Sequence, residues 1–169
     1  MFEPAFLRRA EQLLEALRRR GLKLATAESC TGGLIAGLLT EIAGSSDVIE
    51  RGFVVYSNEA KETMLGVPRS ILDWHGAVSE TCARAMAEGA LKHSLADIAV
   101  SVTGIAGPGG GSSEKPVGLV HFGCASRGGE TNHRRYVFAK ASRHEVRMKS
   151  VNAALDLIEA QLERTTRLA

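Results

Sequence analysis

The chain has 169 residues, of which 44% are hydrophobic and 24% are charged, and 21 Lys and Arg against 19 Asp and Glu leave a formal net charge of +2. This length and composition predict one soluble globular domain and argue against a disordered chain. The charge is too small for the electrostatic footprint of a nucleic-acid-binding protein. The N-terminus carries charges where a signal peptide needs an apolar core, and no run of about 18 apolar residues occurs, so neither secretion nor a membrane span is expected.

The cysteines give no sign of a metal site or a disulfide framework. Cys30, Cys82 and Cys124 are odd in number and lack the Cys-x-x-Cys spacing of a zinc site or redox pair. They suit a reduced cytoplasm, which is the expected location. No Asp-rich calcium loop and no His-x-x-x-His helix occurs, so the sequence calls for no metal and no other cofactor.

Helices and short apolar strands alternate through the first half of the sequence. Apolar residues recur at helical spacing from Ala5 to Arg20, which predicts an amphipathic helix. The apolar run Leu22 to Ala27 predicts a strand, and Thr31 to Ile42 predicts the helix that follows it. The pattern repeats with a strand over Gly52 to Tyr56 and a short helix with its caps at Ser57-Asn58.

The second half predicts two further helices, a glycine-rich loop and three more strands. In order, these are a helix from Ser79 to about His93, a strand over Ile98 to Val102, the loop Gly104 to Ser113, a hairpin of Leu119 to Ala125 with Arg135 to Ala139, and a helix opened by the capping-box pair Ser142 and Glu145. Strands that alternate with amphipathic helices predict an α/β fold. We expect a three-layer α/β/α sandwich with a mixed, mostly parallel sheet, forming a single domain over residues 1–169.

The turn after the first predicted strand, Ala27-Glu28-Ser29-Cys30-Thr31-Gly32-Gly33, combines a hydroxyl, a thiol and two glycines. A serine in such a place is more often a helix cap than a nucleophile. Thr31, directly before the glycines, is itself a good cap, which leaves the Ser29 hydroxyl free to point toward the helix N-terminus. Gly32 and Gly33 would let a substrate approach free backbone N–H groups, as the oxyanion of acyl transfer requires.

Cys30 is the competing nucleophile, since a thiol is intrinsically more reactive and a helix N-terminus would lower its pKa. The turn is not the Gly-x-Ser-x-Gly elbow of α/β-hydrolases, because Ala27 and Thr31 stand where that motif has glycine. None of the five histidines is an evident base for either nucleophile, and structural or surface roles are expected for them.

Lys61 is the most interesting candidate base. If Asn58 caps the short helix, Lys61 lies at the third helical position, where the positive end of the helix dipole disfavours an ammonium ion. A free lysine has a pKa of about 10.4 and needs one of roughly 7 or 8 to act as a base at neutral pH. The dipole alone is insufficient, so burial or another cation, such as Arg143, has to contribute.

Arg143 immediately follows the expected cap Ser142, so a cation occupies a first helical turn where acidic residues normally lie. A guanidinium beside free N–H groups would form a strong clamp for a phosphate or an oxyanion. A simple surface contact with a carboxylate is an equally open interpretation. The loop Gly104 to Ser113 lacks the Gly-Lys-Ser/Thr ending of a P-loop, so a mobile lid or an ordinary flexible loop fits better than an ATP site.

Five separated motifs together resemble the CinA C-terminal domain family, whose stand-alone members are nicotinamide-nucleotide amidases of pyridine nucleotide recycling. The matching segments are Ala25-Thr-Ala-Glu-Ser-Cys-Thr-Gly-Gly33, Tyr56-Ser-Asn-Glu-Ala-Lys61, Gly76-Ala-Val-Ser79, Thr103-Gly-Ile-Ala-Gly-Pro-Gly-Gly-Gly111 and Glu114-Lys-Pro-Val-Gly118. They occur in order from about Leu22 to the final helix.

The resemblance implies hydrolysis of the carboxamide of nicotinamide mononucleotide to nicotinic acid mononucleotide and ammonia. By the same motifs, Ser29 would be the nucleophile, Lys61 its base, Tyr56 a positioning or proton-relay group, and Arg143 a further essential cation. Backbone N–H groups near Cys30, Thr31, Gly32 and Gly33 would hold the oxyanion, while Thr103, Gly104 and Ala106 would line the nucleotide pocket. The expected partners are a small nucleotide substrate and, in a homo-oligomer, further copies of the chain, with no nucleic acid and no membrane.

Two alternatives to the Ser29 amidase remain open. The first is a catalytically silent domain of the same fold that binds a nucleotide or serves competence-associated interactions. The second is a hydrolase that uses Cys30 in place of Ser29.

Overall fold

Helices separate the first three strands along the chain, with three helices in a row between the second and third strands, and two further strands precede the last helix. The structure is a computed structural model that describes residues 2–168, with side chains over residues 2–164. Its elements are α1 (Pro4–Arg19), β1 (Leu24–Glu28), α2 (Leu34–Thr40), the 3-10 helix η1 (Ser45–Asp47), β2 (Ile49–Val54), α3 (Asn58–Leu65), α4 (Arg69–His75), α5 (Glu80–Lys92), β3 (Ile98–Gly104), β4 (Leu119–Ser126), β5 (Asn132–Val137) and α6 (Arg143–Leu168).

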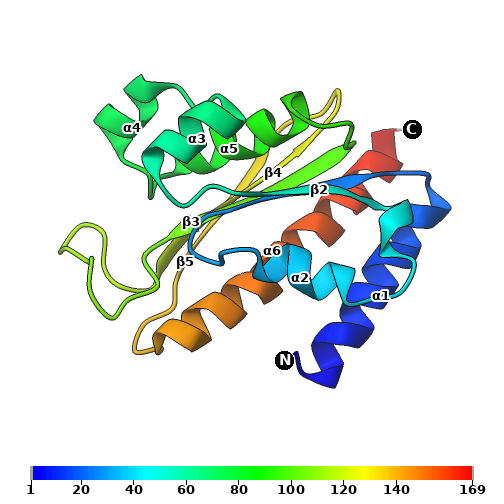
Figure 1. The fold of residues 1–169 in the computed structure, drawn as a ribbon, viewed down its shortest axis with the longest axis horizontal. Coiled ribbons are helices and arrows are strands. Elements are labelled where there is room, and N and C mark those ends of the chain that lie inside the picture. Colours follow the sequence, from blue (N-terminus) through cyan, green and yellow to red (C-terminus); the bar gives the residue numbers. More distant parts are fainter. Residues whose placement is uncertain (1, 169) are drawn as a thin grey trace.

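The strands of the described residues form one five-stranded sheet in the order β2-β1-β3-β4-β5. The β1 strand pairs in parallel with both β2 and β3, whereas β3 with β4 and β4 with β5 are antiparallel. Figure 1 shows α1, α2 and α6 on one face of the sheet and α3, α4 and α5 on the other. The predicted three-layer α/β/α fold with a mixed sheet is therefore confirmed, and so is the hairpin that forms its antiparallel edge.

Each face of the sheet has its own hydrophobic core. Alternate residues of a strand point to opposite faces, so Val100 and Val102 pack toward α1, α2 and α6, while Ala99 packs toward α5. All five residues of β1 are buried, as expected of a parallel strand covered on both sides. The apolar stripe predicted for the last helix is also found, since Val151 and Ile158 are fully buried in the first core.

The C-terminal ends of the parallel strands lie at one edge of the sheet, where open α/β sheets bind their ligands. The segments that follow β1 and β2, and the glycine-rich loop after β3, therefore leave the sheet at the same edge. Figure 1 shows that loop projecting from the sheet at the left, at the same end as the start of α6. The fold thus gathers chain segments that are more than 100 residues apart in sequence, from Ser29 to Arg143.

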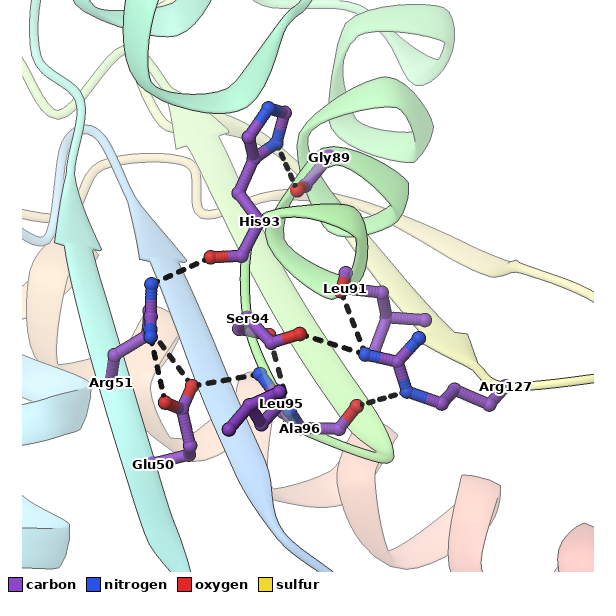
Figure 2. A network of polar contacts seen from close by, with 9 residues as sticks. All are labelled: Glu50, Arg51, Gly89, Leu91, His93, Ser94, Leu95, Ala96 and Arg127. Atoms are coloured by element: carbon purple, nitrogen blue, oxygen red, sulfur yellow. Dashed lines mark hydrogen bonds and ion pairs between the residues drawn. The ribbon is translucent and has the colours of Figure 1, made fainter.

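At the opposite end of the sheet, polar contacts link the β4–β5 turn and strand β2 to the connection between α5 and β3 (Figure 2). The guanidinium of Arg127, in the β4–β5 turn, donates to the carbonyls of Leu91, Ser94 and Ala96 at the end of α5 and before β3. Arg51 of β2 donates to the carbonyl of His93 in the same connection. These contacts are remote from the edge where the ligand is expected.

Two helix starts differ from the prediction. The α2 helix begins at Leu34, not Thr31, because Gly32 and Gly33 have φ angles of +59° and +95°, which a right-handed helix does not allow. The α3 helix is capped by Ser57, whose hydroxyl accepts from the N–H of Ala60, so Asn58 is already the first helical residue. Among the described residues, no helix is both long and apolar enough to cross a membrane.

Candidate active site

Ser29 extends the pairing of β1 beyond the strand itself. Its N–H donates to the carbonyl of Val102 at 3.0 Å, and its own carbonyl accepts from the N–H of Gly32 at 3.0 Å, which closes a tight turn. The turn needs the left-handed backbone of Gly32 and Gly33 to reach α2. Ser29 is therefore fixed between β3 and the start of α2, with 8% of its surface exposed.

The N-terminus of α2 is capped by the side chain of Glu28, a residue that sequence reasoning did not single out. Its carboxylate, fully buried, accepts from the N–H groups of Gly33, Ile35 and Ala36 at 3.1, 3.0 and 2.9 Å. A buried carboxylate with three such donors is well compensated, and it balances the positive end of the helix dipole. Thr31 is not the cap that the sequence suggested.

These contacts decide which N–H groups of the turn are available. Those of Gly32 and Gly33, expected to be free, are already bonded to the Ser29 carbonyl and the Glu28 carboxylate. Within the described turn, the N–H groups of Cys30 and Thr31 are the ones without a backbone or carboxylate acceptor. Any oxyanion held by this turn would use those two.

Lys61 reaches from α3 to the Ser29 hydroxyl. Its side chain is almost fully buried, and its Nζ lies 3.1 Å from Ser29 Oγ, 2.9 Å from the carbonyl oxygen of Val55 and 3.2 Å from that of Tyr56. Burial lowers the pKa of Lys61, and the neighbouring thiols of Cys82 and Cys30 oppose that shift. Because Ser57 caps the helix, Lys61 is its fourth residue, one position later than predicted.

Arg143 joins three parts of the site. As expected, it is the first residue of α6, after a capping box in which Ser142 N–H donates to Glu145 and Glu145 N–H donates to Ser142 Oγ. Its guanidinium donates to the Gly107 carbonyl at 2.7 Å and to the Tyr56 hydroxyl at 3.3 Å. Arg143 is not among the groups that shift the pKa of Lys61. Of the two causes that the sequence analysis considered, burial or a second cation, burial is the one that lowers this pKa.

Arg147 lies one helical turn after Arg143 and was missed by sequence reasoning. Its Nη2 donates to the carbonyl of Thr31 at 3.2 Å, inside the nucleophile turn. Its Nε is buried and has no hydrogen-bond partner among the residues that the structure describes. The available signal was its spacing of four residues from Arg143, which places both side chains on one side of α6.

The other predicted site residues are Cys30 in the nucleophile turn and Thr103, Gly104 and Ala106 at and after the end of β3. Burial raises the pKa of the Cys30 thiol to about 11, so the predicted lowering by a helix N-terminus is wrong. The hydroxyl of Thr103 is buried and donates to the carbonyl of Ala77, while Ala106 is buried in the core. Gly104 ends β3 so close to Leu119 of β4 that a side chain would not fit there.

This arrangement holds the groups that nucleophilic chemistry uses. It provides a hydroxyl, a buried amine within hydrogen-bonding distance, and two N–H groups in the same turn. In the part of the chain that the structure describes, no group of three or more His, Cys, Asp or Glu residues could hold a metal ion.

Comparisons with known proteins show which family the chain resembles. The profile of the CinA C-terminal domain matches residues 7–162. The chain is 49% identical over 166 residues to the nicotinamide-nucleotide amidohydrolase PncC of Escherichia coli K12, covering 98% of this chain and 100% of that protein. It is 51% identical over 145 residues to a CinA-like protein of Akkermansia muciniphila, covering 86% of this chain and 35% of that one.

Some relatives are much longer than this chain, which spans 28% of a competence-damage inducible protein of Caldicellulosiruptor bescii that is 60% identical over 117 residues. Among solved structures, the competence/damage inducible protein CihA of Agrobacterium tumefaciens superposes with a TM-score of 0.93 at 50% identity, covering 96% of this chain and 98% of that one. The similarities to the E. coli protein and to the A. tumefaciens structure extend over almost the whole chain. The chain therefore belongs to the CinA C-terminal domain family.

Proposed function

We propose that this chain is an amidase that hydrolyses the carboxamide of nicotinamide mononucleotide to nicotinic acid mononucleotide and ammonia. The observation that carries the proposal is the 3.1 Å contact between Lys61 Nζ and Ser29 Oγ, made by an amine that is almost fully buried. The similarity to the E. coli nicotinamide-nucleotide amidohydrolase PncC supports the choice of substrate. A role in pyridine nucleotide recycling in the cytoplasm, and a homo-oligomeric state, are part of the same proposal.

The surroundings of Lys61 suit an uncharged amine that acts as a base. A neutral amine has two N–H groups and one lone pair, and the carbonyls of Val55 and Tyr56 can accept the two N–H groups. The lone pair then faces the Ser29 hydroxyl and can take its proton. Burial favours this state because it lowers the pKa of Lys61.

This geometry supports an acyl transfer in two stages. Ser29 Oγ attacks the carboxamide carbon, and the N–H groups of Cys30 and Thr31 bind the oxygen that becomes negative. Lys61 returns its proton to the amide nitrogen, the C–N bond breaks, and ammonia leaves an ester on Ser29. Water then attacks the ester with Lys61 again as the base, and the acid product and free serine are restored. Tyr56 and Arg143, which contact one another, would position the substrate beside these groups.

The first test measures ammonia release from nicotinamide mononucleotide by wild type, Ser29→Ala and Cys30→Ala. Without its nucleophile, Ser29→Ala should lose activity about a thousand-fold or more. Cys30→Ala keeps the backbone N–H at this position. The thiol that it removes has a raised pKa and is a poor nucleophile, so we expect less than about a ten-fold loss of activity. An inactive Cys30→Ala with an active Ser29→Ala would reverse the nucleophile assignment, and wild type that binds the nucleotide without releasing ammonia would support a silent binding domain.

A further inference from the structure

The α6 helix directs two guanidinium groups at the active-site loops. Arg143 contacts Tyr56 and the glycine-rich loop, and Arg147 contacts the carbonyl of Thr31 in the nucleophile turn. A Cβ atom added at Gly32 would lie 3.7 Å from Arg147 Nη2, so the guanidinium lies directly against the turn. The two arginines thus flank the place where a substrate of Ser29 would extend.

Neither Arg143 nor Arg147 forms an ion pair with any of the side chains that the structure describes. Most of the other arginines that form close side-chain contacts have a carboxylate partner: Arg9, Arg18, Arg19, Arg51, Arg69 and Arg84. Within the described side chains, Arg143 and Arg147 instead contact two backbone carbonyls and a phenol. The acid nearest in sequence, Glu145, is occupied by the N–H of Ser142.

The position of these arginines is electrostatically unfavourable in the absence of an anion. Both lie in the first two turns of α6, where the helix dipole is positive, and cations four residues apart on one helix repel each other. The buried Nε of Arg147 also lacks a partner, an arrangement that native proteins rarely keep without a use. A bound anion would relieve the repulsion and accept the remaining N–H donors.

The other obvious anion site near Ser29 is already occupied. The N-terminus of α2 would attract a phosphate, but its N–H groups are bound by the Glu28 carboxylate. That negative charge, fixed at the start of α2, would also repel a phosphate there. The guanidinium groups of Arg143 and Arg147 contact the glycine-rich loop and the nucleophile turn, and neither is neutralised there by a carboxylate of the described residues.

We propose that Arg147, together with Arg143, binds the 5′-phosphate of the substrate, and so makes the enzyme selective for nucleoside monophosphates over nucleosides. The inference rests on the proposed function and assigns one substrate group to these residues. Guanidinium groups suit this task because their planar N–H donors match phosphate oxygens in pairs. The carboxamide would then lie at Ser29 while the phosphate is held beside α6.

The test compares nicotinamide mononucleotide with nicotinamide riboside, which has the same carboxamide and no phosphate. Arg147→Gln should raise KM for the mononucleotide at least ten-fold and change kcat/KM for the riboside by less than about three-fold. Arg147→Lys, which keeps a charge but loses the paired donors, should fall between the two. Lys149→Gln is the matched control, because it removes one charge from the same helix on a side that lines a separate surface cavity.

Two further measurements separate this inference from the proposed function. Inorganic phosphate should inhibit mononucleotide hydrolysis by wild type competitively, and this inhibition should be lost in Arg147→Gln. Calorimetry in the Ser29→Ala background should show mononucleotide binding at least ten-fold tighter than riboside binding, and this comparison needs no turnover. Equal losses on both substrates, or no preference for the mononucleotide in the calorimetry, would overturn the assignment even if the enzyme is an amidase.

Discussion

Lys61 is an amine that the fold holds among oxygens and thiols, away from any carboxylate in the described structure. Its pKa is lowered from the ordinary 10.5 because burial disfavours the charged form. In the unfolded chain the same amine has its ordinary pKa. Between the lowered pKa and 10.5 the unfolded state therefore binds more protons, and linkage requires the stability of the protein to rise with pH in that window.

The first prediction at this scale concerns Lys61→Met, which removes the titrating amine and keeps most of the apolar side chain. Because burial lowers the pKa of Lys61, we expect the free energy of unfolding of wild type, relative to the variant, to increase as pH rises from 7 toward 10. Urea unfolding at several pH values measures this difference. A difference that stays constant would show that Lys61 is charged in the folded protein throughout.

The residues of the site were predictable to the extent that they break local rules. Ser29 and Arg143 were found because a free hydroxyl and a cation at a helix start are unusual, and the contact between Ser29 and Lys61 agrees with the interpretation. Glu28 and Arg147 were missed because their roles depend on partners brought by the fold. A carboxylate in a strand looks ordinary until the start of α2 lies within its reach.

At the scale of elements, helix starts show the same limit. Thr31 before two glycines is a good cap by local propensity, yet the positive φ angles of Gly32 and Gly33 delay α2 to Leu34, and Glu28 provides the cap from the preceding strand. By contrast, the capping box of Ser142 and Glu145 was predictable because both partners belong to one local segment. Local signals thus predict a helix start only where its cap is also local.

The connection between α5 and β3 supports a prediction about Arg127 (Figure 2). This side chain donates to three carbonyls at the end of α5 and after it, at 2.7 to 2.9 Å. Arg127→Ala leaves these carbonyls without their charged donor, so it should reduce the free energy of unfolding by about 1–2 kcal/mol. The specific activity of the folded fraction should not change, since these contacts lie at the end of the sheet that is remote from Ser29.

The control for Arg127 is Arg19→Ala, which also removes an arginine from the surface. Arg19 is 73% exposed in its side chain and pairs with Glu15 one helical turn away, so its loss should cost under about 0.5 kcal/mol. Urea midpoints of the two variants, with unchanged dependence on urea concentration, provide the comparison. Equal destabilisation by both substitutions would mean that the carbonyl contacts of Arg127 contribute no more to the free energy of unfolding than an exposed ion pair does.

For the whole molecule, the layers were predictable and the arrangement of strands was not. Alternating strands and amphipathic helices indicated three layers, because each helix needs a sheet on which to bury its apolar face. The order β2-β1-β3-β4-β5 depends on pairings between distant segments, such as Ala27 with Ser101, which leave no local signal. That order nevertheless creates the site, since it brings the ends of β1, β2 and β3 to one edge.

The sheet also places a histidine pair between β4, β5 and α5, and this pair supports the last prediction. His121 Nδ1 lies 2.9 Å from His133 Nε2, and His133 faces Glu80 at the start of α5. Burial, with contributions from His133, Arg135 and Lys115, lowers the pKa of His121 from 6.5 to about 4. Burial also lowers the pKa of His133, which Glu80 opposes.

The folded protein therefore keeps His121 neutral at a pH where the unfolded chain protonates it. Stability should fall as pH decreases from 6.5 toward 4, and this group should account for on the order of 2 kcal/mol of the loss. His121→Gln cannot titrate but can still hydrogen-bond, so its free energy of unfolding should fall by that much less than that of wild type between pH 7 and pH 4. Urea unfolding at several pH values measures this difference. The control is His144→Gln, a substitution at an exposed position, which should behave like wild type. If His121→Gln and wild type instead lose stability in parallel, the interior around β4 tolerates a protonated imidazole, and the acid sensitivity of the fold comes from other groups.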